Sequence, residues 1–138
     1  MQEKRKKITA GVLTVFVLAF IWGNSCLSGE NSSAVSGFAG QMLAHLFGPR
    51  VLEATAVLRK VGHFTEFACL GGLLGWNARL YRRGRFAPPA LAGLLVAMAD
   101  ETIQRFVPGR ASMVTDVWID FGGVLAGLAI YALLSRRK

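Results

Sequence analysis

Long apolar runs alternate with polar connections along this chain, and the lengths of the runs fit a lipid bilayer. Apolar stretches cover about residues 8–23, 61–81 and 114–134, and most charged residues lie outside them. A helix needs about 20 predominantly apolar residues to cross the hydrocarbon core of a membrane. A soluble domain of 138 residues would instead place charges every few positions. The pattern therefore predicts an all-α, polytopic membrane protein.

The segment between the second and the last of these runs is less apolar. Its apolar part, residues 87–99, has only 13 residues, and the polar run Asp100–Arg105 follows it. Pro88 and Pro89 favour a helix that begins here, because the first turn of a helix does not need their missing N–H groups. A full span over about 87–107 requires the polar residues to lie in a cavity lined by protein.

The distribution of basic residues favours this additional span. With four spans, eleven Lys and Arg residues lie on one side of the membrane and five on the other. The side with the excess is expected to be cytoplasmic. Without the third span, the basic cluster at 136–138 would lie outside. We predict one domain over residues 1–138, a four-transmembrane-helix bundle in the bacterial cytoplasmic (inner) membrane with both termini in the cytoplasm and an uncleaved first helix.

The connection from Asn24 to Lys60 contains an apolar stripe at helical spacing. Its members are Val35, Phe38, Met42 and Leu46. Such a stripe is typical of an amphipathic helix that lies in the membrane interface or dips into it as a re-entrant segment. A helix that packs on the other spans would give the same pattern. Both interpretations of this outer helix remain open.

Charge and glycine spacing narrow the choice of partners. The net charge of +8 comes from short clusters without interleaved aromatic residues, so we expect no nucleic acid. We expect membrane lipids instead. Small residues four positions apart let neighbouring helices approach closely, either within the chain or in a homodimer. Two such glycine pairs occur, Gly71 with Gly75 and Gly123 with Gly127.

Polar side chains on three predicted helices are expected to meet in the outer half of the membrane. They are His63 and Glu66 on the second, Asp100, Glu101 and Gln104 on the third, and Asp116 and Asp120 on the fourth. The five acidic groups would cost on the order of 12–17 kcal/mol if they faced lipid at mid-depth. A typical fold has only about 5–15 kcal/mol of net stability. The sequence therefore predicts a shared polar pocket open to the extracytoplasmic face.

The same residues carry a resemblance to a known family. His63-Phe-Thr-Glu66, the run Asp100-Glu101-x-x-Gln104-x-Phe106-x-Pro108-Gly109-Arg110, and Asp116-x-x-x-Asp120 resemble the VanZ-like membrane proteins, as does the Ser-rich stretch 25–33. The resemblance covers about residues 12–134. The family's namesake is associated with resistance to the glycopeptide antibiotic teicoplanin. The resemblance implies a role in the cell envelope and attaches no reaction to the site.

Three functions remain open at this point. A binding protein would use Gln104, Arg105, Arg110, Asp116 and Asp120 to hold a lipid headgroup or a lipid-linked cell-wall precursor. A metal-dependent hydrolase or transferase would bind a divalent cation through His63, Glu66, Asp116 and Asp120, with Asp100 or Glu101 as general base beside the catalytic His63 and Glu66. A proton- or ion-coupled carrier would relay protons through the carboxylates.

Overall fold

The computed structural model describes residues 1–26, 51–84, 86–108 and 113–136. These residues form helices and contain no strand, so the predicted all-α fold class is confirmed for this part of the chain. The helices are α1 (Gln2–Cys26), α3 (Val51–Leu80), α4 (Ala87–Arg105) and α5 (Val114–Arg136).

Two of the described helices are long and apolar enough to cross a membrane. These are α1, with 25 residues, and α5, with 23 residues. Both expose large apolar side chains, such as Phe16 on α1 and Leu133 on α5. On α4, Leu91, Leu95 and Met98 form a further exposed apolar stripe. Apolar surface of this extent favours a lipid environment, whereas spans through α3 and α4 stay a prediction.

The helix boundaries differ from the predicted spans mainly at the start of α3. This helix begins at Val51, ten residues before the apolar run, so the long connection after α1 is shorter than the sequence suggests. The apolar stripe predicted for the outer helix lies within 27–50, outside the described residues. The start of α4 agrees with the prediction, since prolines occupy its first turn. Pro88 and Pro89 therefore lie in the first turn of α4, as expected.

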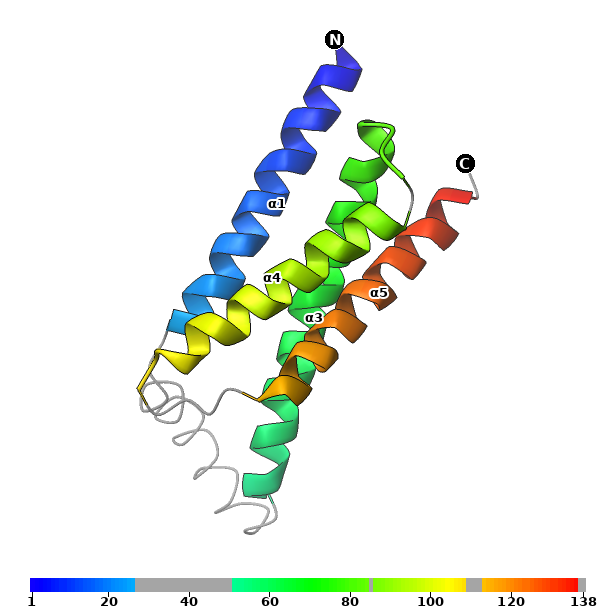
Figure 1. Cartoon of the computed structure of the whole chain (residues 1–138). Coiled ribbons are helices and arrows are strands. Elements are labelled where there is room, and N and C mark those ends of the chain that lie inside the picture. Colours follow the sequence, from blue (N-terminus) through cyan, green and yellow to red (C-terminus); the bar gives the residue numbers. More distant parts are fainter. Residues whose placement is uncertain (27–50, 85, 109–112, 137–138) are drawn as a thin grey trace.

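The four described helices alternate in direction along the chain (Figure 1). The start of α1 and the ends of α3 and α5 lie together, and they carry the basic clusters. Lys7 lies over the Tyr81 ring at 5.4 Å in this region. The last turns of α1 and α4 and the first turn of α5 lie at the opposite end. We call these the basic end and the acidic end.

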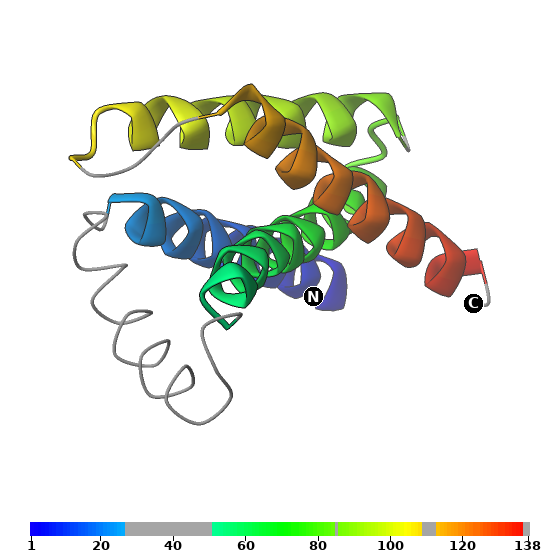
Figure 2. The same cartoon turned by 90° about the horizontal axis from the view of Figure 1, so that it is seen from below.

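Helices α3 and α5 run parallel and form the most extensive contact, while α4 lies across one side of the bundle (Figure 2). Glycines bring their backbones together. A Cβ atom on Gly123 would collide with the Phe64 carbonyl oxygen, and one on Gly127 with the Ala68 carbonyl oxygen. The small core beside this contact consists of Ile21, Phe67, Leu70, Ala97, Val124 and Leu128. We call the α3–α5 contact the glycine seam. A homodimer through these faces stays a prediction, because the glycines already pack within one chain.

One side-chain amide ties α3 to α1. The Nδ2 atom of Asn77 donates to Thr14 Oγ1 at 3.0 Å and, within α3, to the Leu73 carbonyl oxygen at 2.9 Å. A weaker contact of 3.4 Å reaches the Ala10 carbonyl oxygen. Hydrogen bonds between helices hold bundles together where water is scarce. Asn77 is therefore a structural residue of the basic half of the bundle.

Candidate functional site

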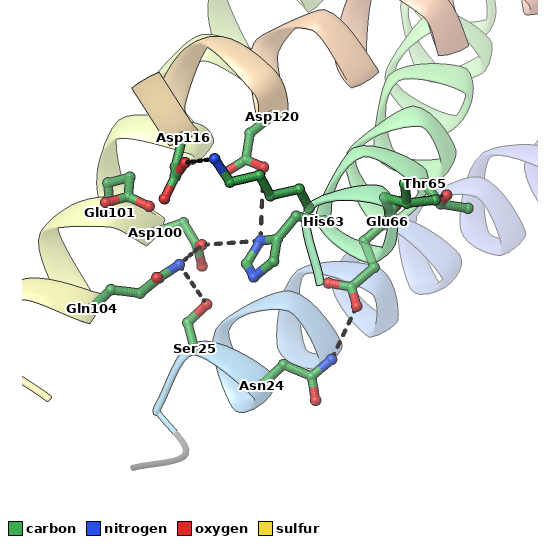
Figure 3. A network of polar contacts seen from close by, with 12 residues as sticks. Asn24, Ser25, His63, Thr65, Glu66, Asp100, Glu101, Gln104, Asp116 and Asp120 are labelled. Atoms are coloured by element: carbon green, nitrogen blue, oxygen red, sulfur yellow. Dashed lines mark hydrogen bonds and ion pairs between the residues drawn. The ribbon is translucent and has the colours of Figure 1, made fainter. Parts of the chain in front are cut away.

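Polar side chains from all four described helices gather at the acidic end (Figure 3). Helix α1 contributes its last turn, α3 its third to fifth turns, α4 its last two turns and α5 its first two turns. The parallel course of α3 and α5 places Lys60 level with Asp116 and His63 level with Asp120. The glycine seam begins directly after these residues, so backbone contact sets the spacing of the two helices at the site.

Asp100 lies at the centre of the cluster and is fully buried. Gln104, one turn later on α4, donates from Nε2 to Asp100 Oδ2 at 2.7 Å. The same Nε2 donates to Ser25 Oγ on α1 at 3.4 Å. A buried carboxylate with a charge-assisted hydrogen bond of this length is held firmly in place. The last turn of α1 thus belongs to the site.

The imidazole of His63 lies between two aspartates (Figure 3). Its Nδ1 atom is 3.7 Å from Asp120 Oδ1 and 4.0 Å from Asp100 Oδ2. Both distances are too long for a hydrogen bond, which brings an N–H donor to within about 3.2 Å of its acceptor. One donor atom from each of the three residues lies within 4.8 Å of the others.

The remaining acidic residues have partners of different kinds. Asp116 Oδ1 lies 3.7 Å from Lys60 Nζ, an ion pair at the edge of the site where the lysine is 44% exposed. Glu101 Oε2 accepts a hydrogen bond from the Met113 backbone N–H at 3.2 Å. Glu66 Oε1 accepts one from Asn24 Nδ2 at 3.1 Å, on the α1 side of α3. These three carboxylates therefore lie around the group formed by His63, Asp100 and Asp120 and are not part of it.

A small cavity opens among these side chains. Its volume is about 20 Å³, enough for a single water-sized group. The lining residues are Lys60, His63, Glu101, Gln104, Asp116, Ile119 and Asp120. Carboxylates outnumber basic groups in this lining, so it suits a cation, an ammonium group or a hydroxyl donor.

The comparison with known families agrees with the sequence motifs. A family model described as VanZ/LLP1 matches residues 9–135. The chain belongs to the VanZ/LLP1 family. No curated protein and no solved structure matches it. The resemblance to VanZ-like proteins is thereby confirmed, and with it the expected extent of the match.

In this VanZ/LLP1 protein, the residues predicted for a metal do not all meet. His63 and Asp120 lie side by side, but Glu66 points to Asn24 and Asp116 to Lys60 (Figure 3). Asp100, predicted as a general base, takes the third position instead. The ligand atoms that lie together are thus those of His63, Asp100 and Asp120, and metal binding by Glu66 and Asp116 stays a prediction.

The residues predicted for binding also separate. Gln104, Asp116 and Asp120 line the cavity of the VanZ/LLP1 chain. Arg105 is exposed and makes no ion pair with the described residues. Arg110 lies within 109–112, outside the described residues. The role of the two arginines stays a prediction.

Three residues at the site were absent from the predicted set: Asn24, Ser25 and Lys60. Asn24 and Ser25 follow the first apolar run directly, at the depth where α4 ends. Their position at the outer end of the first predicted span was a signal that could have placed them. Lys60 occupies the same place before the second predicted span.

Proposed function

We propose that this VanZ/LLP1 protein is a multi-pass protein of the bacterial cytoplasmic membrane that binds, or acts on, a lipid headgroup or a lipid-linked cell-envelope precursor. The segregation of charge supports the orientation. Basic clusters gather at one end of the helices and are expected in the cytoplasm. The carboxylate-rich cavity at the opposite end would then open to the extracytoplasmic face.

One observation carries the proposal: three helices place charged side chains around a cavity that lies beside exposed apolar helix surface. A lipid headgroup offers matching chemistry, because its polar groups lie where acyl chains meet water. The cavity accepts only one small group, so we expect an ammonium, hydroxyl or ion-bound oxygen to enter it. The rest of the headgroup would remain outside, where Arg105 is exposed and Lys60 is partly exposed, so that both can meet phosphate.

Binding can be tested on the protein purified in detergent and reconstituted into nanodiscs. The probes are phosphatidylethanolamine, phosphatidylglycerol and a polyprenyl-diphosphate-linked sugar precursor, each supplied in a phosphatidylcholine background. Retention is measured by native mass spectrometry. We expect one probe to be retained, and Asp116→Asn to reduce its retention about tenfold, since a lost charge-assisted contact costs about 1.4 kcal/mol or more.

The matched control is Glu3→Gln, which removes a carboxylate at the basic end, where Glu3 pairs with Lys7 at 3.3 Å. This variant should retain the probe as the unaltered chain does. Equal retention of all three probes, or equal retention by the Asp116 variant, would contradict the proposal. Protection against glycopeptides such as teicoplanin would be one consequence of an envelope role and can be measured in cells that express the same variants.

A metal-dependent hydrolase or transferase is the second candidate, favoured by the cluster of His63, Asp100 and Asp120. Glu101 lines the same cavity and would act as general base toward a water or hydroxyl nucleophile. The incubation with the polyprenyl-diphosphate probe tests this candidate when it is analysed for sugar phosphate, which hydrolysis of the diphosphate bond would release together with polyprenyl phosphate. Product that forms with the unaltered chain and disappears with Glu101→Gln would identify an enzyme.

A further inference from the structure

We infer that His63, Asp100 and Asp120 together bind one divalent cation, of the zinc or manganese type. Three separate helices supply the ligands: α3 the imidazole, α4 one carboxylate and α5 the other. This set differs from the one that the sequence suggested. The inference deepens the proposed function, because the cation would be the group that meets an oxygen of the headgroup.

The first support is geometric. Donor atoms around a tetrahedral zinc ion lie about 3.3 Å apart, which follows from bond lengths of about 2.0–2.2 Å. Here His63 Nδ1 lies 3.7 Å from Asp120 and 4.0 Å from Asp100, with all three donors inside 4.8 Å. Shortening these three separations by about 0.4–1.5 Å would complete a coordination shell. Without an ion, the same distances are too long for hydrogen bonds.

The second support is independent of the spacing. Asp120 is 1% exposed, and neither of its carboxylate oxygens has a hydrogen-bond partner. Asp100 is fully buried, and its Oδ1 atom likewise has none. A buried polar group without a partner costs about 1–3 kcal/mol, and more when it carries charge. Two such aspartates facing one imidazole indicate that something positively charged completes the cluster.

The ligand types narrow the choice of ion. An imidazole nitrogen suits zinc and other transition metals, whereas calcium and magnesium prefer oxygen alone. Three protein ligands leave a coordination position open, as in catalytic zinc sites. His63 and Asp120 also line the 20 Å³ cavity, which gives the open position room for one water or one oxygen of a bound molecule.

The surrounding hydrogen bonds resemble the outer shell of a metal site. Gln104 donates to Asp100 Oδ2, the oxygen that lies 4.0 Å from His63 Nδ1, and so fixes this carboxylate beside the imidazole, while Oδ1 has no hydrogen-bond partner. Ser25 fixes Gln104 in turn. Outer partners of this kind orient the ligands and raise metal affinity. The last turns of α1 and α4 thereby contribute to the site without contacting the ion.

The alternative is structural: a protonated His63 would bridge the two aspartates and need no ion. The two arrangements respond differently to added metal. A bridging imidazolium binds no zinc. It would also tolerate Glu66→Gln and Asp116→Asn no better or worse than a metal site, so stability alone does not separate the two. Metal stoichiometry does.

The test uses the full chain, purified in detergent with chelator and then dialysed against Zn²⁺, Mn²⁺ or Ca²⁺ alone, with no lipid probe added. Elemental analysis gives the stoichiometry and calorimetry the affinity. We expect one Zn²⁺ or Mn²⁺ per chain and no Ca²⁺. Asp120→Asn, Asp100→Asn and His63→Gln should each weaken binding more than tenfold.

Glu66→Gln and Asp116→Asn are the matched controls, because each removes a carboxylate beside the cluster and leaves the three ligands intact. Both should bind the ion within threefold of the unaltered chain. Variants are compared only if they elute as one species and unfold cooperatively; Asp120→Asn keeps the shape of the side chain, and His63→Gln provides a second test on another helix.

Absence of stoichiometric metal in the unaltered chain would overturn the inference and leave His63 as a bridging imidazolium. Losses with Glu66→Gln and Asp116→Asn as large as those with Asp120→Asn would overturn it in favour of the set predicted from sequence. Because no lipid is present, metal binding without headgroup retention would contradict the proposed function alone. Headgroup retention by a chain that binds none of the three ions would contradict the inference alone.

Discussion

Asn77 and Asp120 are both polar side chains on helices with apolar surroundings, but only Asn77 has hydrogen-bond partners for its side chain. In the basic half, the Asn77 amide donates to acceptors on α1 and α3. In the acidic half, Asp120 is buried more completely and has no hydrogen-bond partner for either oxygen. Proteins rarely leave a buried polar atom without a partner. The satisfied amide thus serves structure, whereas the unsatisfied acid indicates a ligand.

Helices α3 and α5 pass through both halves, and the contact between them lies between the two polar regions. Gly71, Gly123 and Gly127 bring the backbones of α3 and α5 into contact between Asn77 on one side and His63 on the other. Buried oxygens of Asp100 and Asp120 can remain without hydrogen-bond partners only if another contact holds the helices together. The glycine seam supplies that support, so the site does not need to stabilise the fold.

The largest expected effect therefore comes from the seam. Gly127→Ala places a Cβ atom against the Ala68 carbonyl oxygen and 2.8 Å from the Gly72 nitrogen, both of which belong to the α3 backbone. Backbone cannot move aside as a flexible side chain can. We expect a loss of about 3 kcal/mol in the free energy of unfolding, the upper part of the range for overpacking. Thermal or denaturant unfolding in detergent measures it.

Gly11→Ala on α1 is the control, since nothing lies within 4 Å of an added Cβ at that position. It should leave stability unchanged or raise it slightly, because alanine favours helix. If Gly127→Ala were as stable as Gly11→Ala, the seam would not be the contact that holds the two halves.

A smaller effect, which changes sign with metal, is expected for Asp120→Asn. In the presence of chelator, the variant should be more stable than the unaltered chain by about 1 kcal/mol, because it removes a buried acid that has no hydrogen-bond partner. With Zn²⁺ at about 100 times its dissociation constant, the unaltered chain should gain about 2.7 kcal/mol and the variant almost nothing. Unfolding curves with and without metal give both numbers.

The matched variant for this measurement is Asp116→Asn, whose side chain pairs with Lys60 instead of joining the cluster. It should gain stability from Zn²⁺ as the unaltered chain does. Destabilisation of metal-free protein by Asp120→Asn would show that this acid, like Asn77, is a structural residue, and the contrast between the two halves would disappear.

The smallest effect concerns the pair of Asn77 and Thr14. A double-mutant cycle with Asn77→Leu and Thr14→Val isolates the 3.0 Å hydrogen bond between them. Hydrogen bonds between helices in membrane proteins contribute about 0.6 kcal/mol on average. We expect a coupling energy near this value, and no change in metal affinity. Altered metal affinity would show that the basic half is part of the site.

The sequence predicted the helices well where apolar runs are long, and less well at their ends. Hydropathy marks the part of a helix that suits lipid, so the ten residues of α3 before Val61 were assigned to a connection. Nothing in residues 51–60 breaks a helix, since they contain neither Gly nor Pro. The membrane span predicted from hydropathy is therefore shorter than the helix that contains it.

The gathering of acids was predictable, but their pairing was not. Glu66 follows His63 by three positions, which turns it about 60° around α3. This rotation is enough to direct Glu66 to Asn24 on α1 while His63 faces Asp120 on α5. The rotation of α3 is fixed by where the glycines meet its backbone. Spacing along one helix cannot reveal that choice.

The glycine seam also bears on how this architecture can change over generations. Because main-chain atoms hold α3 and α5 together just below the cavity, the ligand-bearing positions can exchange side chains without loss of the frame. Descendants of such a chain could acquire new chemistry at 63, 100 and 120 while the three glycines persist. The backbone arrangement would then be retained even when the function of the cavity changes.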